Sequence, residues 1–243
     1  MDISTAAVNS YQAECSGGDT MVEDGWKVVR DFMDVLKIEG LKYALYRGQS
    51  NSTWKLVPSL FRSHRGIGHV DQLRDWKRRA ARFAHPLPRD DIEWLILAQH
   101  YGLHTPMLDW TTSPLVALFF ACEGIETKEK DGCIWWVHQR DFVDPHDTLF
   151  IDLFSESRDK PIMLNAVGRN VRSTTQDSVL TLHTKDDYST LKARRIFTVK
   201  GQDKHETLLV LEKLGFSAER LHHDLGKLIQ RIKTEIAGRT ASL

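Results

Sequence analysis

The stretch that decides the fold runs from Leu97 to Ala121 and reads LAQHYGLHTPMLDWTTSPLVALFFA. It places polar side chains between two strongly apolar segments; these side chains are Gln99, His100, Asp109, Thr111 and Ser113. Because buried polar groups need hydrogen-bond partners, such a run either caps a helix or lines a cleft. Ser113 followed by Pro114 is a strong N-terminal signal, so we expect a helix from Pro114 to Ala121 with Ser113 as its cap.

A second polar run, Tyr46-Arg47-Gly48-Gln49, ends the apolar segment that begins at Leu41. This segment is typical of a strand, and Gly48 permits a tight exit from it and a close approach of ligand to backbone. The planar guanidinium of Arg47 suits a phosphate or a carboxylate. A structural ion pair between Arg47 and Asp109, or another buried acid, is the alternative interpretation.

The remaining pattern predicts an α+β fold, because helices group around strands without βαβ alternation. Apolar residues at steps of three and four predict a helix over 23–39, with Trp26, Val29, Met33 and Leu36 on one face. Further helices are expected at 70–84, 90–101, 205–214 and 224–236, and strands at 132–137 and 193–199. We expect one domain over 23–238, with helices around a small mixed sheet, a flexible arm at 1–22 and an irregular insertion with brief strands near 139–190.

Composition limits the functional classes. The 33 basic residues balance the 33 acidic ones, which argues against bulk attraction to nucleic acid or to an anionic membrane. Three scattered cysteines cannot form a disulfide framework and favour a reducing compartment. With no apolar run of about 18 residues and no secretory leader, we expect a cytoplasmic protein without a membrane partner.

Two local features bear on partners. The predicted helix over 70–84 carries five basic residues between Arg74 and Arg82 against one acid, Asp75. This face could contact a nucleic-acid backbone, although a solvated helix face is the commoner explanation. The eleven histidines show no zinc-ligand spacing, so no metal is expected.

Four blocks of the chain resemble the FRG family, named for a Phe/Tyr-Arg-Gly motif. They are Tyr46–Gln49, the segment WKLVPSLFR at 54–62, the long run from Gln99 to Ala121, and a C-terminal part made of Arg195-Ile196 and residues 211–229. The resemblance spans about 41–232. One departure is that His104-Thr105-Pro106 stands where relatives often carry Pro-Thr-Arg, which removes a cation.

The arrangement of these blocks is similar in outline to ADP-ribosyltransferases, which transfer ADP-ribose from NAD to a macromolecule. The resemblance implies that Arg47 corresponds to the cation that holds NAD, and Thr111-Thr112-Ser113 to a later Ser-Thr-Ser-like element. A third element, a glutamate at the ribose, has no convincing match; Glu206 and Glu212 are the nearest acids.

The leading hypothesis is therefore a nucleotide or anion pocket where the two polar runs meet, with NAD as the candidate cofactor. His100 and Asp109 are the candidate catalytic residues, as a general base and its partner; structural roles remain open, a core hydrogen bond for His100 and an Asx-type turn for Asp109. The candidate binding residues are Tyr46, Arg47, Gln49, Arg62, Gln99, Trp110, Thr111 and Ser113. A non-enzymatic module that binds protein or nucleic acid is the alternative, and a hydrolase using His100 and Asp109 is a third possibility.

Overall fold

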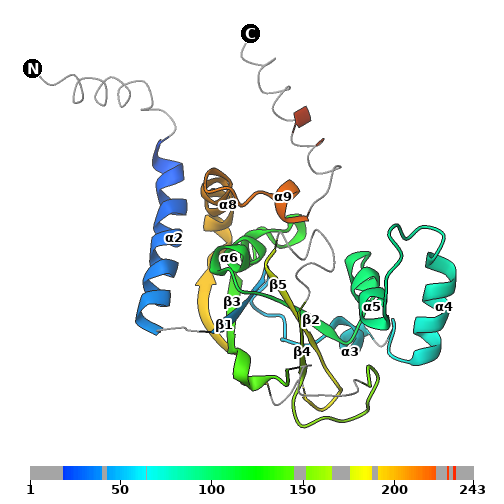
Figure 1. The fold of residues 1–243 in the computed structure, drawn as a ribbon. Helices are drawn as coiled ribbons and strands as arrows, with labels where there is room; N and C mark the ends of the chain where they lie inside the picture. Colours follow the sequence, from blue (N-terminus) through cyan, green and yellow to red (C-terminus); the bar gives the residue numbers. More distant parts are fainter. Residues whose placement is uncertain are drawn as a thin grey trace, which may run out of the picture.

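A six-stranded antiparallel sheet organises the computed structural model (Figure 1). The structure describes residues 19–39, 43–63, 65–144, 152–165, 176–187, 191–222 and the positions 229, 232 and 233. The strands lie in the order β4-β5-β2-β1-β3-β6. Their bounds are β1 Ala44–Gln49, β2 Met107–Thr111, β3 Gly132–His138, β4 Ile162–Asn165, β5 Ser178–Leu182 and β6 Arg194–Val199.

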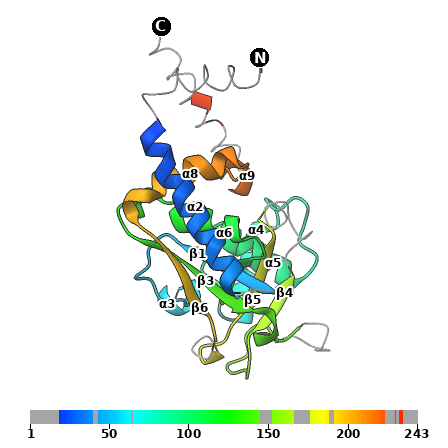
Figure 2. The ribbon, with the colours of Figure 1, turned by 90° about the vertical axis from the view of Figure 1, so that its left-hand side faces the viewer.

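The helices cover one face of this sheet in two groups. Over the β1-β3-β6 half lie α2 (Asp19–Glu39), α6 (Pro114–Cys122) and α8 (Lys204–Lys213), with α9 (Ala218–His222) beside them; Figure 2 shows α2 crossing in front of this half. Over the β4-β5-β2 half lies α5 (Asp91–His100), backed by α4 (Val70–Ala80), while the short α3 (Ser59–Ser63) follows β1. The other face is covered by irregular segments that supply Leu56, Phe142 and Leu191.

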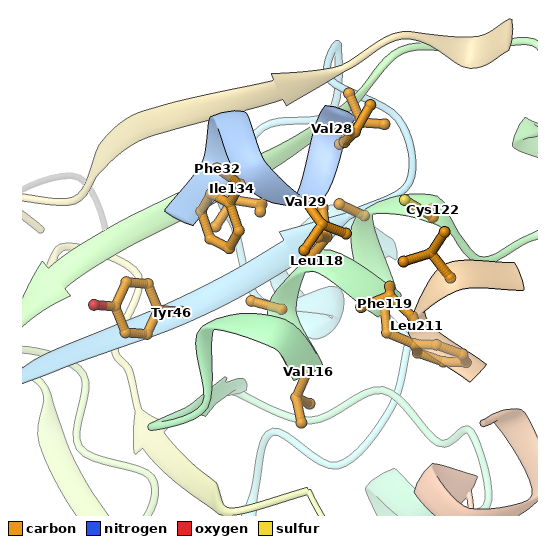
Figure 3. Close-up of a cluster of buried hydrophobic side chains, with 14 of the residues drawn as sticks. Val28, Val29, Phe32, Tyr46, Val116, Leu118, Phe119, Cys122, Ile134 and Leu211 are labelled. Atoms are coloured by element: carbon orange, nitrogen blue, oxygen red, sulfur yellow. The ribbon is translucent and has the colours of Figure 1, made fainter. Parts of the chain in front are cut away.

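The main core joins α2, α6 and α8 to β1 and β3. Figure 3 shows Phe32 and Val29 of α2 meeting Ile134 of β3 and Leu118 of α6, all buried. Burying each such side chain contributes about 1.5–3 kcal/mol. This contact explains why the uniformly apolar helix α6 sits at the centre of the molecule rather than on its surface.

Gly48 is required by this packing. A Cβ atom at Gly48 would lie 2.0 Å from the carbonyl oxygen of Ala117 and 2.6 Å from the amide nitrogen of Ala121, both in the backbone of α6. The missing side chain at Gly48 therefore lets helix α6 lie directly against β1.

The α+β class is confirmed, and the Ser113 cap is as expected, since its side chain accepts from the Val116 amide. Every pair of neighbouring strands is antiparallel, so the sheet is not mixed. The helix predicted to start at residue 23 begins at Asp19, inside the predicted arm, whose residues 1–18 lie outside the described part. On that helix Phe32 rather than Met33 enters the core.

The region 139–190 contains brief strands, as expected, but these strands are part of the main sheet. Its strands β4 and β5 belong to the sheet, and β5 lies between β4 and β2 with every residue buried. Most of the helix expected over 224–236 lies outside the described residues. Within the described part of the chain, no helix combines the length and apolar character needed to cross a bilayer.

Candidate functional site

The candidate site forms where β1 and β2 diverge. These neighbouring strands share one registered pair, Tyr46 with Thr111, whereas β1 pairs with β3 along its whole length. Beyond that pair, Arg47 bridges the opening: its Nη1 atom donates to the backbone carbonyl oxygen of Asp109 at 2.6 Å. The Arg47 side chain thus connects β1 to β2 where the two strands are no longer paired.

A cavity of about 210 Å³ opens at this point. Helix α5 supplies one wall with Ile96, Gln99 and His100, and helix α6 supplies another with Val116 and Phe120. Strands β1, β2 and β5 complete it with Tyr46, Arg47, Gly48, Asp109, Trp110, Thr111, Ser178 and Leu180, and Gln176 lies just before β5. Figure 1 shows α5 and α6 on either side of β2. The two polar runs of the sequence therefore meet at one hollow.

Arg47 is an under-compensated cation in this cavity. Its Nε atom is buried and has no hydrogen-bond partner among the described residues, while 22% of its side chain is still exposed. The nearest carboxylate oxygen, Oδ2 of Asp109, is 3.9 Å from Nη1, at the outer limit for an ion pair. Burial lowers the pKa of the Arg47 guanidinium, Asp109 opposes this effect and the charge of Arg62 adds to it. The site therefore favours an added negative charge.

Asp109 and His100 stand at the accessible side of the cavity. Asp109 lies within β2 and 55% of its side chain is exposed, so the Asx-type turn considered for it is wrong. The ion pair with Arg47 that was the alternative interpretation is present at 3.9 Å. His100 is exposed at the end of α5 with its ring against that of Tyr101, at 5.3 Å between centroids, rather than inside the core.

Trp110 is held from behind by a buried polar chain that the sequence analysis did not anticipate. Its Nε1 donates to Oγ1 of Thr181 at 2.9 Å, which lies 2.7 Å from Nε2 of His183. The other ring nitrogen of His183 is 3.1 Å from Asp187, whose second oxygen accepts from the Thr184 amide. The His183 and Asp187 side chains are fully buried. With neutral His183 every member is paired, so the chain fixes the indole in place.

Buried aromatic rings form walls rather than stacking surfaces here. Trp110 is 2% exposed and its ring lies against Phe142, and Tyr46 is 5% exposed within the main core. Burial raises the pKa of the Tyr46 hydroxyl. Thr111 is committed as well, since its hydroxyl donates to the carbonyl oxygen of Gln176 and accepts from the Ser113 amide.

Three of the other candidate residues, Gln49, Arg62 and Ser113, fall outside the cavity lining. Gln49 is buried beside β3, where its Oε1 accepts from Nε1 of Trp135 at 2.7 Å. Ser113 caps α6, and Arg62 is exposed on α3. Gln99 does line the cavity, and its Oε1 accepts from the Thr105 hydroxyl. Among the described lining residues there is no glutamate, so neither Glu206 nor Glu212 reaches the site.

Strand β5 supplies lining residues that sequence reasoning missed. Gln176, Ser178 and Leu180 come from the region interpreted as an irregular insertion. The signal was weak, because all five positions of β5 are buried and its sequence SVLTL carries no polar face toward solvent.

The basic helix α4 is largely neutralised. Arg74 pairs with Asp71, Arg78 and Arg79 share Asp75, and Lys77 pairs with Asp91. Within the described residues no cluster of three or more His, Cys, Asp or Glu side chains is placed to hold a metal ion.

Comparison with known proteins gives one match, to a family model described as the FRG domain, over residues 42–130. No curated protein and no solved structure matches the chain. The matched segment contains β1, α5, β2 and α6, and thus both polar runs and the two helical walls of the cavity. The C-terminal block of the expected resemblance lies outside it. With Tyr46-Arg47-Gly48 and the run Leu97–Ala121 inside the match, the chain contains an FRG domain.

Proposed function

We propose that the cavity around Arg47 binds the phosphate-bearing part of a small anionic ligand, a nucleotide. The observation that carries this proposal is the Arg47 guanidinium. Among the residues that the structure describes, its buried Nε has no partner, and the nearby carboxylate of Asp109 is 3.9 Å away and half-exposed. Arginine presents a fixed fork of donors that fits phosphate oxygens. A guanidinium whose donors are not all satisfied gains charge-assisted hydrogen bonds when an anion enters.

The volume limits how much of a ligand the cavity takes. About 210 Å³ is below the 300–1,000 Å³ typical of sites that enclose a whole drug-sized ligand. A dinucleotide would therefore place one phosphate-containing part inside and leave the remainder along the opening, where His100 and Asp109 stand.

In its specific form, the proposal is ADP-ribosyl transfer from NAD to a macromolecule. NAD would supply ADP-ribose on a bond to nicotinamide, which breaks as the acceptor's nucleophile bonds to the ribose carbon. Arg47 binds the pyrophosphate charge. Asp109 is the carboxylate available at the cavity, and with His100 it takes the proton from the acceptor. Buried, reduced thiols at Cys122 and Cys133 support a cytoplasmic setting.

Isothermal titration calorimetry with ADP-ribose and NAD tests the binding step. Arg47→Ala should weaken affinity about tenfold to a hundredfold, since hydrogen bonds to a charged group contribute roughly 1.5–3 kcal/mol. Arg78→Ala is the matched control, because Arg78 is exposed on α4 and paired with Asp75. No binding to the wild type, or equal binding by Arg47→Ala as checked for folding by thermal melting, would contradict the proposal.

Release of nicotinamide in the presence of candidate acceptors tests the reaction separately. Asp109→Asn and His100→Ala should abolish release while ADP-ribose still binds. If ADP-ribose binds and the wild type releases no nicotinamide, the cavity is a binding site only, and the non-enzymatic alternative is favoured.

A further inference from the structure

A second hollow lies on the outer side of α5, away from the sheet. It is formed by α4, α5 and the segment 81–90 that joins them, and its volume is about 640 Å³. Most of its lining is apolar, and its larger apolar side chains are Trp76, Phe83, Leu87, Ile96, Leu97 and Tyr101. Figure 1 shows α4 and α5 at the edge of the molecule, on the side away from α2 and α8. We call this hollow the α4–α5 groove.

The apolar side chains of the groove are unusually exposed. Phe83 is 75% exposed, Tyr101 72% and Leu87 58%. Contiguous apolar surface of this kind on a folded domain marks an interaction site. A small molecule enclosed in a pocket would bury most of its own surface between the walls. The exposed rings of Phe83 and Tyr101 are better suited to a partner surface that packs over them.

The charge beside the groove is positive. Arg79 lines it and shares the single carboxylate of Asp75 with Arg78. The guanidinium of Arg82 lies 5.0 Å from the ring centroid of Phe83, and among the described residues it has no carboxylate within ion-pair distance.

The one carboxylate in the lining does not offset this charge. Glu93 accepts from Nε, Nη2 and the backbone amide of Arg89. This neighbour lowers the pKa of the Glu93 carboxyl, which is therefore charged and already matched. An occupant with apolar anchors and negative charge is complementary to the groove.

We propose that the α4–α5 groove binds a segment of a partner protein that carries apolar anchor residues flanked by Asp or Glu. Its apolar side chains fill the hollow between Trp76 and Leu97, and its carboxylates meet Arg79 and Arg82. An amphipathic helix laid into a groove between helices is a recurrent form of such recognition. The proposal is independent of the anion cavity, although Ile96 lines both hollows.

Selection from a random peptide library displayed on phage tests this proposal with the full chain. Recovered peptides should be enriched in apolar residues together with Asp and Glu. A synthetic peptide of the recovered sequence, followed by fluorescence anisotropy, should bind Phe83→Ser and Arg82→Glu at least tenfold more weakly than the wild type. Ile125→Ser is the matched apolar control at 90% exposure, and Arg74→Glu on α4 is the charge control; both should bind normally.

Three results would overturn the proposal. The first is recovery of no peptide, or of basic peptides. The second is equal binding by Phe83→Ser and the wild type. The third is a wild-type dimer in sedimentation velocity that Leu87→Ser converts to monomer, which would make a second copy of the chain the occupant.

Discussion

Replacing Gly48 by alanine should lower the stability of the fold, because the added methyl group would collide with helix α6 at distances that the structure gives. The added methyl group would meet three backbone atoms of α6, at 2.0 Å from the Ala117 oxygen, 2.6 Å from the Ala121 nitrogen and 2.9 Å from the Phe120 carbonyl carbon. No flexible side chain can move aside. Either β1 or α6 must shift, and α6 carries Val116 into the anion cavity and Leu118 into the main core.

The expected cost is about 3 kcal/mol, the upper part of the range for overpacking a well-packed core. For a chain of this size, 1 kcal/mol corresponds to roughly 2–4 °C in Tm, so the variant should melt about 6–12 °C below the wild type. Gly102→Ala is the matched control. Gly102 has a φ of +82° and nothing within 4 Å of its Cβ position, so its cost is backbone strain of about 1 kcal/mol.

Differential scanning calorimetry of the wild type and both variants provides the comparison. The larger loss should belong to Gly48→Ala, and its affinity for ADP-ribose should fall as the α6 wall moves. If Gly48→Ala melts no lower than Gly102→Ala, the contact between β1 and α6 is looser than described and the reasoning is refuted.

Three further outcomes are expected. Asp109→Asn should tighten ADP-ribose binding about fivefold in calorimetry, because the Asp109 carboxylate lies 3.9 Å from the guanidinium that would hold the phosphate. Two like unit charges about 4 Å apart in a water-like medium repel by roughly 1 kcal/mol, and weaker binding would contradict this expectation. Burial lowers the pKa of His183, so the unfolded chain binds its proton first and stability should fall below about pH 6.5, by up to about 1.4 kcal/mol per pH unit. Urea titrations should show a flatter pH slope for His183→Gln, and an unchanged slope would refute the assignment. Lys204→Met should cost at least about 2 kcal/mol in the same assay, since buried Nζ donates to two backbone carbonyl oxygens; a neutral result would contradict this.

Local signals in the sequence were sufficient for most helices and for the meeting of the two polar runs. Ser113 and Pro114 determine where α6 begins. The Ser113 hydroxyl accepts a hydrogen bond from the free backbone amide of Val116, and Pro114 has no backbone N–H that would need a partner. The residues Tyr46, Arg47, Gln99, His100, Asp109, Trp110 and Thr111 do line one cavity. The helix starts and these cavity residues could be predicted because they depend on residue type and spacing within short segments.

The pairing of strands that are far apart in the sequence could not be predicted from such local signals. Strand β5 is buried at every position and therefore lacks the alternation that marks a strand, and its place beside β2 depends on contacts some 70 residues apart. For the same reason the polar chain from Trp110 to Asp187 was missed. Gln49 was assigned to the binding site from its neighbours in sequence, whereas in the structure its side chain is hydrogen-bonded to Trp135 of the neighbouring strand β3.

The most direct test of the account is the Nε–Hε resonance of Arg47 in a ¹⁵N–¹H NMR spectrum, assigned by its loss in Arg47→Lys. Addition of ADP-ribose should shift this resonance saturably, because the guanidinium acquires an anionic partner, while the exposed and paired Arg78 stays unchanged. An Arg47 resonance that does not move at any ADP-ribose concentration, or that moves no more than Arg78, would contradict the proposed anion site.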